Sequence, residues 1–389
     1  MNHLNHKAMN DIITQWSPPS HVLFGRGACI QLPEKLKALG VKKPIVLTDK
    51  GVAHTKIMED IKQLLIDSNI EFELFDDVIP EPPVSCLEAA RAQAFEAGGV
   101  DSVIGVGGGS AMDVAKALSL VLKHDDKIHN YMGVNNVQHR GLPSILLPTT
   151  AGTGSEVTPI AILTDTETQL KIGIVSQLIL PDISLVDPAL TDSMPPQVTA
   201  ATGMDALTHA IEAMISKKTN PYSQALALEA VSLISQSLRQ AYQDGNDQHA
   251  RDQMAAASTL AGMSFASSSC LAVHALAYPL GGRYQVPHGQ ANAMLLAATM
   301  RFNAPACQRE FSRLANAMQL KPSTPERFLQ ELEKLTQYLN IPATMASVGV
   351  TKDKIPEMAR DACSNKRLMV PNPQTVTISD SEDIYYSIL

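Results

Sequence analysis

Four side chains in the second half of the sequence have the types and spacing of a metal-binding set. Asp205 and His209 stand four residues apart in "GMDALTHAIEA", so on a helix they face the same way. His274 and His288 enclose the weakly charged stretch "HALAYPLGGRYQVPH", and we expect a bend at Gly281–Gly282 to bring them together. One carboxylate and three imidazoles suit Fe(II), Zn(II), Mn(II) or Co(II) and are too rich in nitrogen for Mg or Ca.

Each of these histidines, taken singly, has a simpler explanation as a hydrogen-bonded core residue. Other histidines lie in the N-terminal tail or in polar loops and are not part of the set: His3, His6, His124, His129, His139 and His249. The metal interpretation depends on the combination of three imidazoles in helical, weakly charged segments with an aspartate four residues before one of them.

A second chemical motif is the glycine-rich turn in "SVIGVGGGSAMDVAK". Gly107, Gly108 and Gly109 separate an expected strand from an expected helix, where they let the backbone approach a ligand closely. The amides at the N-terminus of the helix would then face a pyrophosphate. Ser110 occupies the last glycine position of GxGxxG, and no GK[ST] follows, so the motif is not a Walker A loop. The alternative is a tight structural turn.

Two further segments fit a dinucleotide. Asp49 closes the strand "KPIVLTD", where a carboxylate suits the 2'-hydroxyl of NAD and repels the 2'-phosphate of NADP; the alternative is a helix N-cap. The loop "LPTTAGTGSEVTP" carries hydroxyl groups that can donate to phosphate and ribose oxygens, although a plain threonine-rich loop has the same composition. These hydroxyls belong to Thr149, Thr150, Thr153 and Ser155.

The surrounding pattern predicts the elements that position these residues. Between about residues 44 and 147, β-branched runs alternate with amphipathic segments such as 57–68, as in an α/β fold with a parallel sheet. After Pro195 and Pro196 the chain becomes rich in Ala, Leu and Met and is expected to be helical. We therefore predict an NAD-binding α/β domain over residues 1–193 and an all-helical, metal-binding and catalytic domain over 194–389.

Composition limits the class of protein. The chain has 389 residues, a formal net charge of -8 and 45% hydrophobic residues, which indicates a globular protein and disfavours a nucleic-acid-binding surface. Its five cysteines are scattered and form no CxxC pair, which favours a reducing cytoplasm. We find no signal peptide and no apolar run of membrane-spanning length. The expected partner is a small molecule.

Taken together, the motifs "GVGGGSAMDVAK", "PTTAGTGSEVTP", "DALTHAIEA" and "HALAYPLGGRYQVPHGQANA" resemble the iron-containing (group III) alcohol dehydrogenase family, from about Trp16 onward. The resemblance implies a Rossmann-like NAD(P) domain, a helical domain, a site in the cleft between them and a homodimer. It places the metal ligands at Asp205, His209, His274 and His288, and the NAD-selective aspartate at Asp49. The cofactor contacts that it implies are Gly107, Gly108, Gly109, Ser110, Asp113, Thr149, Thr150, Ser155 and Lys171.

The resemblance leads us to expect an NAD-dependent, metal-assisted alcohol dehydrogenase or aldehyde reductase, with Fe(II) or else Zn(II) as the metal. Three alternatives stay open: a dehydroquinate synthase-like lyase of the same architecture, a zinc glycerol dehydrogenase with a smaller ligand set, and a metal-stabilised scaffold with closed coordination. Many family members have a second histidine one turn after the third ligand, as a proposed proton relay. This chain has Tyr278 there, which can carry a proton or form an aromatic wall.

Arg283 suggests a substrate class. It lies in an otherwise uncharged stretch, five residues from Tyr278 and five before His288. A guanidinium binds a carboxylate with two parallel hydrogen bonds. Arg283 and Tyr278 are therefore expected to hold the far end of an ω-hydroxy acid such as 4-hydroxybutyrate. The alternative is that Arg283 pairs with an acidic residue of its own chain or points into solvent.

Overall fold

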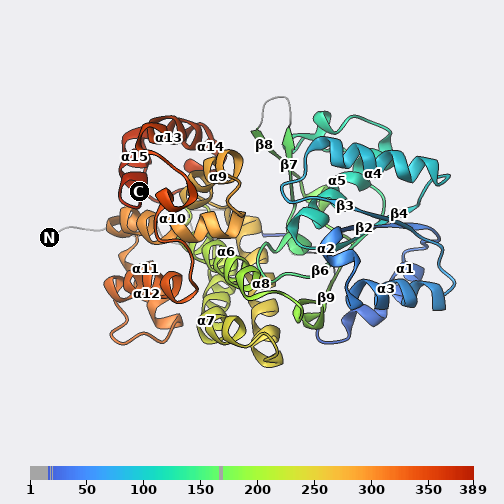
Figure 1. Cartoon of the computed structure of the whole chain (residues 1–389), viewed down its shortest axis with the longest axis horizontal. Coiled ribbons are helices and arrows are strands. Elements are labelled where there is room, and N and C mark those ends of the chain that lie inside the picture. Colours follow the sequence, from blue (N-terminus) through green and yellow to red (C-terminus); the bar gives the residue numbers. More distant parts are fainter. Residues whose placement is uncertain (1–15, 18, 20, 166–169) are drawn as a thin grey trace.

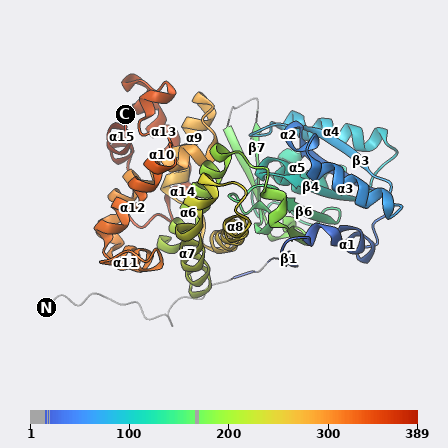
Figure 2. The same cartoon turned by 60° about the horizontal axis from the view of Figure 1, so that its bottom comes forward.

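The computed structural model describes residues 16–17, 19, 21–165 and 170–389. An α/β part and a helical part lie side by side, with strand β7 (Ile160–Asp165) near their boundary (Figure 1 and Figure 2). Helix α6 (Pro196–Ile215) begins the helical part, with Pro195 as its N-cap and Pro196 as its first residue.

The main sheet has six strands in the order β1-β9-β6-β4-β2-β3, and all neighbouring strands are parallel. The predicted parallel sheet is therefore confirmed, including the expected strands "KPIVLTD" and the one before the glycine turn. The strands are β1 (Val22–Phe24), β2 (Pro44–Asp49), β3 (Glu73–Val78), β4 (Ser102–Gly107), β6 (Ser144–Pro148) and β9 (Ile183–Val186). The chain passes from β2 to β3 on one side and then to β4 on the other, so the strand order reverses between β2 and β4. Ligands of such sheets bind at this switch point, beyond the carboxyl ends of the strands.

Helices cover both faces of this sheet. Helices α4 (Val84–Glu96) and α5 (Gly109–His124) pack on the face that contains Ile45 and Leu47. Val46 points to the opposite face and packs with α1 (Leu32–Ala38) and α3 (Lys56–Asp67). This alternation along β2, with both faces buried, explains why its sequence is an almost continuous apolar run.

A second, three-stranded sheet extends from the α/β part. Strand β8 (Leu170–Val175) pairs antiparallel with β7 and parallel with the short β5 (Gly133–Val134). The tip of the β7–β8 hairpin, residues 166–169, lies outside the described residues. Lys171, near the start of β8, is thereby placed next to α9 (Ala272–Tyr284) of the helical part.

The helical part is built around α6, which is buried over most of its length. One hydrophobic core unites its helices. The others are α7 (Pro221–Gln243), α8 (Gln248–Ser268), α9, α10 (His288–Asn303), α11 (Gln308–Ala317), α12 (Pro325–Tyr338), α13 (Ile355–Ser364), α14 (Lys366–Met369) and α15 (Ile378–Tyr386). Among the described residues no single helix is long and apolar enough to cross a membrane; α8 and α9 pass that test only as a pair bent by 107°.

The prediction of a bend at Gly281–Gly282 is wrong. Helix α9 continues through both glycines, and the chain reverses at Gln285, whose φ is 55°. A helical glycine costs only about 1 kcal/mol relative to alanine, which the burial of α9 outweighs. Gly281 instead permits a close approach, because a Cβ there would lie 3.0 Å from Oε1 of Glu81.

Candidate metal centre and cofactor cradle

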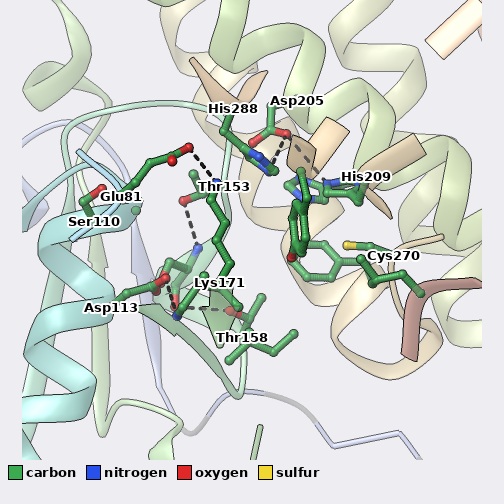
Figure 3. Close-up of a pocket in the computed structure, with 18 of the residues that line it drawn as sticks. Glu81, Ser110, Asp113, Thr153, Thr158, Lys171, Asp205, His209, Cys270 and His288 are labelled. Atoms are coloured by element: carbon green, nitrogen blue, oxygen red, sulfur yellow. Dashed lines mark hydrogen bonds and ion pairs between the residues drawn. The ribbon is translucent and has the colours of Figure 1, made fainter. Parts of the chain in front are cut away.

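Three helices bring the predicted metal ligands together (Figure 3). Helix α6 carries Asp205 and His209, α9 carries His274, and His288 is the first residue of α10. Oδ1 of Asp205 lies 3.7 Å from Nε2 of His288 and 3.9 Å from Nε2 of His274. The rings of His209 and His274 stack with centroids 4.7 Å apart. Ligand atoms of Asp205, His274 and His288 lie within 4.8 Å of one another, and His209 joins this group through its ring contact with His274.

Hydrogen bonds fix the orientation of these ligands. Nδ1 of His274 lies 2.6 Å from a carboxylate oxygen of Glu212, and Nδ1 of His209 lies 3.3 Å from the carbonyl oxygen of Gly152. The Nδ2 group of Asn292 donates to Oδ1 of Asp205 at 2.7 Å. Both imidazoles thus use Nδ1 for orientation and leave Nε2 for the centre, the usual arrangement around a bound metal.

The sequence analysis did not identify Glu212 and Asn292, although both stand at helical spacing from a proposed metal ligand. Glu212 follows Asp205 by seven residues, which is two turns on the same face of α6. Asn292 follows His288 by four residues on α10. Buried polar side chains at these spacings from a proposed ligand are the expected positions of supporting groups.

The chemistry of the donor set fits a divalent cation. Nε2 of His274 is buried and has no hydrogen-bond partner among the described residues. Burial, reinforced by Lys171 and the other imidazoles, lowers the pKa of His288 to about 3, so this ring is a neutral donor. Burial raises the pKa of Asp205, but the three imidazoles and Asn292 outweigh it and the net pKa is lowered, which keeps the carboxylate anionic. Burial lowers the pKa of His209 and of His274, but Asp205 and Cys270 outweigh it at His209, and Cys270 and Glu212 outweigh it at His274, so both net pKa values are raised. Metal binds neutral imidazoles and an ionised carboxylate, so its binding must displace protons from these two rings.

Cys270 also reaches this centre, and sequence reasoning missed it. Its Sγ and one ring nitrogen each of His209 and His274 all lie within 4.8 Å of one another. Burial raises the pKa of the thiol, but His274 and His209 outweigh it, and the net pKa is about 7. The centre therefore offers a soft thiolate beside the O/N set, which is a ligand type that zinc accepts.

The glycine turn after β4 has the geometry of a phosphate cradle. Gly107 has φ of 156°, and a Cβ there would lie 2.7 Å from Cβ of Ala111. A Cβ on Gly109 would lie 2.8 Å from Cγ2 of Thr153. Gly108 is the N-cap of α5 and provides no side-chain cap, so the first amides of this helix are left for an anion.

Asp49 lies beside this cradle, at the switch point between β2 and β4. Its Oδ1 accepts a hydrogen bond from the amide of Val52 at 3.0 Å, so the residue is the N-cap of the short helix α2 (Lys50–Ala53). Its Oδ2 lies 3.6 Å from where a Cβ on Gly107 would be. Asp49 is therefore a helix N-cap, as the alternative interpretation expected, and this role uses only Oδ1. Its Oδ2 atom lies beside the glycine turn.

The hydroxyl-rich loop is attached to α5 by a polar cluster. Ser155 donates to Oδ1 of Asp113 at 2.5 Å, and the amide of Ile162 donates to Oδ2 at 2.9 Å. The buried ammonium of Lys116 lies 3.3 Å from Oδ1 of Asp113. Asp113 and Ser155 thus bind each other and hold the loop in place. By contrast, Oγ1 of Thr150 is buried without a partner among the described residues and lies close to Gly108.

A cavity of about 210 Å³ lies between the two parts and contains both sets of residues. The predicted site residues that line it are Gly109, Ser110, Asp113, Thr153, Ser155, Lys171, Asp205, His209, His274, Tyr278 and His288. Asp49, Gly107, Gly108, Thr149 and Thr150 lie outside its lining, at the strand ends beside it. Figure 3 shows Ser110 and Asp113 on α5 facing the Asp205–His288 cluster across this space.

Tyr278 and Lys171 form part of the cavity wall. The Tyr278 ring lies 6.3 Å from the His288 ring, and Nζ of Lys171 lies 5.3 Å from the centroid of the Tyr278 ring. Lys171 also pairs with Oε1 of Glu81 at 2.6 Å. The Tyr278 hydroxyl has no hydrogen-bond partner in the part of the chain that the structure describes, so it is available to a ligand.

The structure does not bring Arg283 to the cavity. Its guanidinium pairs with Glu357 at 2.9 Å and with Asp361, both on α13. The reason is helical geometry: five residues along a helix correspond to a rotation of about 140°, so Arg283 and Tyr278 point in different directions. The observed pairing is the alternative that the sequence left open, and it does not support a substrate-binding role for Arg283.

Two family models together match most of the chain. Residues 19–188 match "Iron-containing alcohol dehydrogenase", and residues 199–389 match "Fe-containing alcohol dehydrogenase family, C-terminal". Long-chain-alcohol dehydrogenase 1 of Geobacillus thermodenitrificans is 40% identical over 377 residues, which are 95% of this chain and 94% of the relative.

Solved structures agree with these matches. A crystal structure of 1,3-propanediol oxidoreductase has a TM-score of 0.93 and 35% identity, and the match covers 97% of this chain and all of the other. Sulfoacetaldehyde reductase from Bifidobacterium kashiwanohense, in complex with NAD+, has a TM-score of 0.88 and 30% identity, with 97% and 99% coverage.

Proposed function

The chain belongs to the iron-containing alcohol dehydrogenase family, and from this premise we propose that it interconverts a short-chain alcohol and its aldehyde with NAD. We further propose that Fe(II) is the resident metal, held by Asp205, His209, His274 and His288. The observation that carries the proposal is the shared cavity: the metal-binding set and the end of the phosphate cradle at Gly109 and Ser110 line one space of about 210 Å³.

The residues of the chain have distinct roles in this reaction. When bound, the divalent cation supplies a Lewis acid for the alcohol oxygen, and the nicotinamide supplies the hydride acceptor. The first amides of α5 hold the pyrophosphate, and Glu212 keeps Nε2 of His274 directed at the centre. The free hydroxyl of Tyr278 lies at the cavity wall, where it can donate a hydrogen bond to substrate or to a water molecule that carries the proton.

NAD rather than NADP is the proposed cofactor. The carboxylate of Asp49 ends β2 beside the cradle and would repel a 2'-phosphate. The NAD+ complex of the sulfoacetaldehyde reductase gives a precedent in a homologous fold.

The alternatives fit the site less well. A dehydroquinate synthase-like lyase needs a strongly basic phosphate pocket. Among the described lining residues Lys171 is the one lysine and Arg367 the one arginine, and Lys171 is already paired with Glu81. A glycerol dehydrogenase-type zinc site has fewer ligands than the four found here. A scaffold would have a closed metal site, whereas this centre opens into a cavity.

Two further proposals concern the setting of the enzyme. Cys29, Cys86, Cys270, Cys307 and Cys363 are all free thiols, which supports the cytoplasm as the compartment. Strand β1 is an edge strand, and Phe24 on it is half exposed, which supports burial of this edge in a homodimer. Size-exclusion chromatography with light scattering tests the dimer directly.

The function is tested by metal reconstitution. The apoprotein is loaded anaerobically with Fe(II) or Zn(II) and assayed with NAD against a panel of primary alcohols, diols and hydroxy acids. We expect net NADH formation with at least one substrate and only after metal addition. NADH formation that is absent for the whole panel, or equally fast without metal, would contradict the proposal.

A further inference from the structure

Arg367 is a cationic residue of the cavity wall that the sequence motifs did not single out. It lies on the short helix α14, it is half-buried, and it lines the same cavity as Tyr278 and His288. Within the described ranges, the Arg367 guanidinium has no hydrogen bond, ion pair or aromatic partner. An arginine keeps its charge at all relevant pH values and has five donors to satisfy. Arg367 is therefore a residue of the cavity lining whose guanidinium has no protein partner among the described residues.

The other charged side chains of the cavity lining each have a close polar neighbour. Glu81 pairs with Lys171 at 2.6 Å. Asp113 lies 3.3 Å from the ammonium of Lys116, just behind the wall. Asp205 lies within 4 Å of two imidazoles and belongs to the metal set. Arg367 thus leaves one positive charge without a counterion in a space that receives both cofactor and substrate.

The position of Arg367 favours the substrate over the cofactor as its partner. Helix α14 packs against α9, which carries His274 and Tyr278, so Arg367 lies on the helical side of the cavity (Figure 1). The phosphate cradle at Gly109 and Ser110 lies on the α/β side. The metal ligands also belong to the helical side, so Arg367 shares its wall with the end of the cavity where the substrate is expected to bind.

We propose that Arg367 binds an oxyanion, a carboxylate in the first instance, at the end of the substrate opposite its alcohol or aldehyde group. The proposal rests on the proposed function and specifies its substrate class: short ω-hydroxy acids and the corresponding semialdehydes. It assigns to Arg367 the role that the sequence suggested for Arg283. Arg283 cannot fill that role in this structure because Glu357 and Asp361 occupy its donors.

The test compares Arg367→Ala with the matched control Arg283→Ala. Both remove a guanidinium from the helical part, but only the first removes one from the cavity. For each protein, kcat/KM is measured with 4-hydroxybutyrate and with 1,4-butanediol, an uncharged alcohol of equal chain length. A charge-assisted hydrogen bond contributes about 1.5 to 3 kcal/mol. Arg367→Ala should therefore lower the acid-to-diol preference by about one to two orders of magnitude, and Arg283→Ala should leave it unchanged.

A second measurement separates substrate from cofactor phosphate. Fluorescence titration with NADH should give the same Kd for wild type and Arg367→Ala; a matching loss of NADH affinity would overturn the assignment to substrate. Arg367→Lys should recover part of the preference for the acid, because it restores the charge without the planar fork. A wild-type enzyme that oxidises the diol but shows no preference for the acid would also overturn the inference. Failure on every alcohol would instead refute the proposed function.

Discussion

Glu212 and His274 form the hydrogen bond that most directly determines the geometry of the metal centre. The carboxylate of Glu212 lies 2.6 Å from Nδ1 of His274. It also accepts hydrogen bonds from the backbone amides of Leu271 and Val273, at 2.7 and 2.8 Å. The same side chain therefore satisfies the uncapped start of α9 and sets the direction of the imidazole. It connects the folding of a helix end to the position of a ligand.

Glu212→Gln should weaken metal binding without changing NADH affinity. The glutamine amide keeps the shape of the Glu212 side chain. Its NH2 group, however, cannot accept a hydrogen bond, whereas both carboxylate oxygens of Glu212 lie against N–H groups or against Nδ1 of His274. Loss of such a supporting partner typically lowers metal affinity by about 10- to 100-fold. Chelator competition with Zn(II) or Co(II) measures the effect. Glu229, an exposed residue of α7, provides the control: Glu229→Gln should bind metal like wild type, and equal affinities in both variants would contradict the assignment.

Cys270→Ser should lower the affinity for Zn(II) more than that for Fe(II). The thiolate is a soft ligand beside His209 and His274, and soft ligands favour zinc. Competitive loading followed by metal analysis gives the ratio. A near-ultraviolet thiolate-to-cobalt charge-transfer band in the Co(II) protein, absent in the variant, would show the contact directly. An unchanged metal ratio together with no such band in wild type would leave Cys270 a packing residue.

Asp49→Asn should increase the use of NADP relative to NAD by about tenfold or more, because a negative charge that repels the 2'-phosphate is removed. Asparagine retains the acceptor that caps α2, so the local fold is preserved. The ratio of kcat/KM for the two cofactors is the measurement. If that ratio does not move, Asp49 serves only as a helix cap.

Gly289→Ala should destabilise the protein and weaken its metal centre together. A Cβ at this position would overlap the carbonyl oxygen of Ala201 and lie 3.2 Å from Cβ of Asp205, so α10 must move away from α6. Overpacking of this kind costs about 1 to 3 kcal/mol. The control is Gly282→Ala, where a Cβ meets nothing within 4 Å and helix propensity is expected to stabilise α9. Thermal unfolding and metal affinity should fall only in the first variant.

Much of this arrangement follows from local sequence patterns. The alternation of β-branched runs with amphipathic segments predicts the parallel sheet, and the spacing of Asp205 and His209 predicts their shared face of α6. These predictions succeed because strand and helix periodicity are properties of a few consecutive residues.

The remaining features depend on tertiary contacts that no local pattern contains. The Gly281–Gly282 pair signals a turn, yet burial of α9 keeps it helical. Arg283 is close to Tyr278 in sequence but diverges from it around the helix toward α13. Cys270 and Arg367 reach the site only because a turn before α9 and the packing of α14 on α9 place them there.

The central claim is that Asp205, His209, His274 and His288 hold a divalent cation needed for hydride transfer to NAD. The most direct test is His288→Ala, with metal content, NADH binding and alcohol-dependent NADH formation measured on the same preparation. We expect the variant to lose bound metal and turnover, and to bind NADH as tightly as wild type, because the cradle at Gly107–Gly109 belongs to the other part of the molecule. A variant that retains full metal content and full activity would contradict the claim.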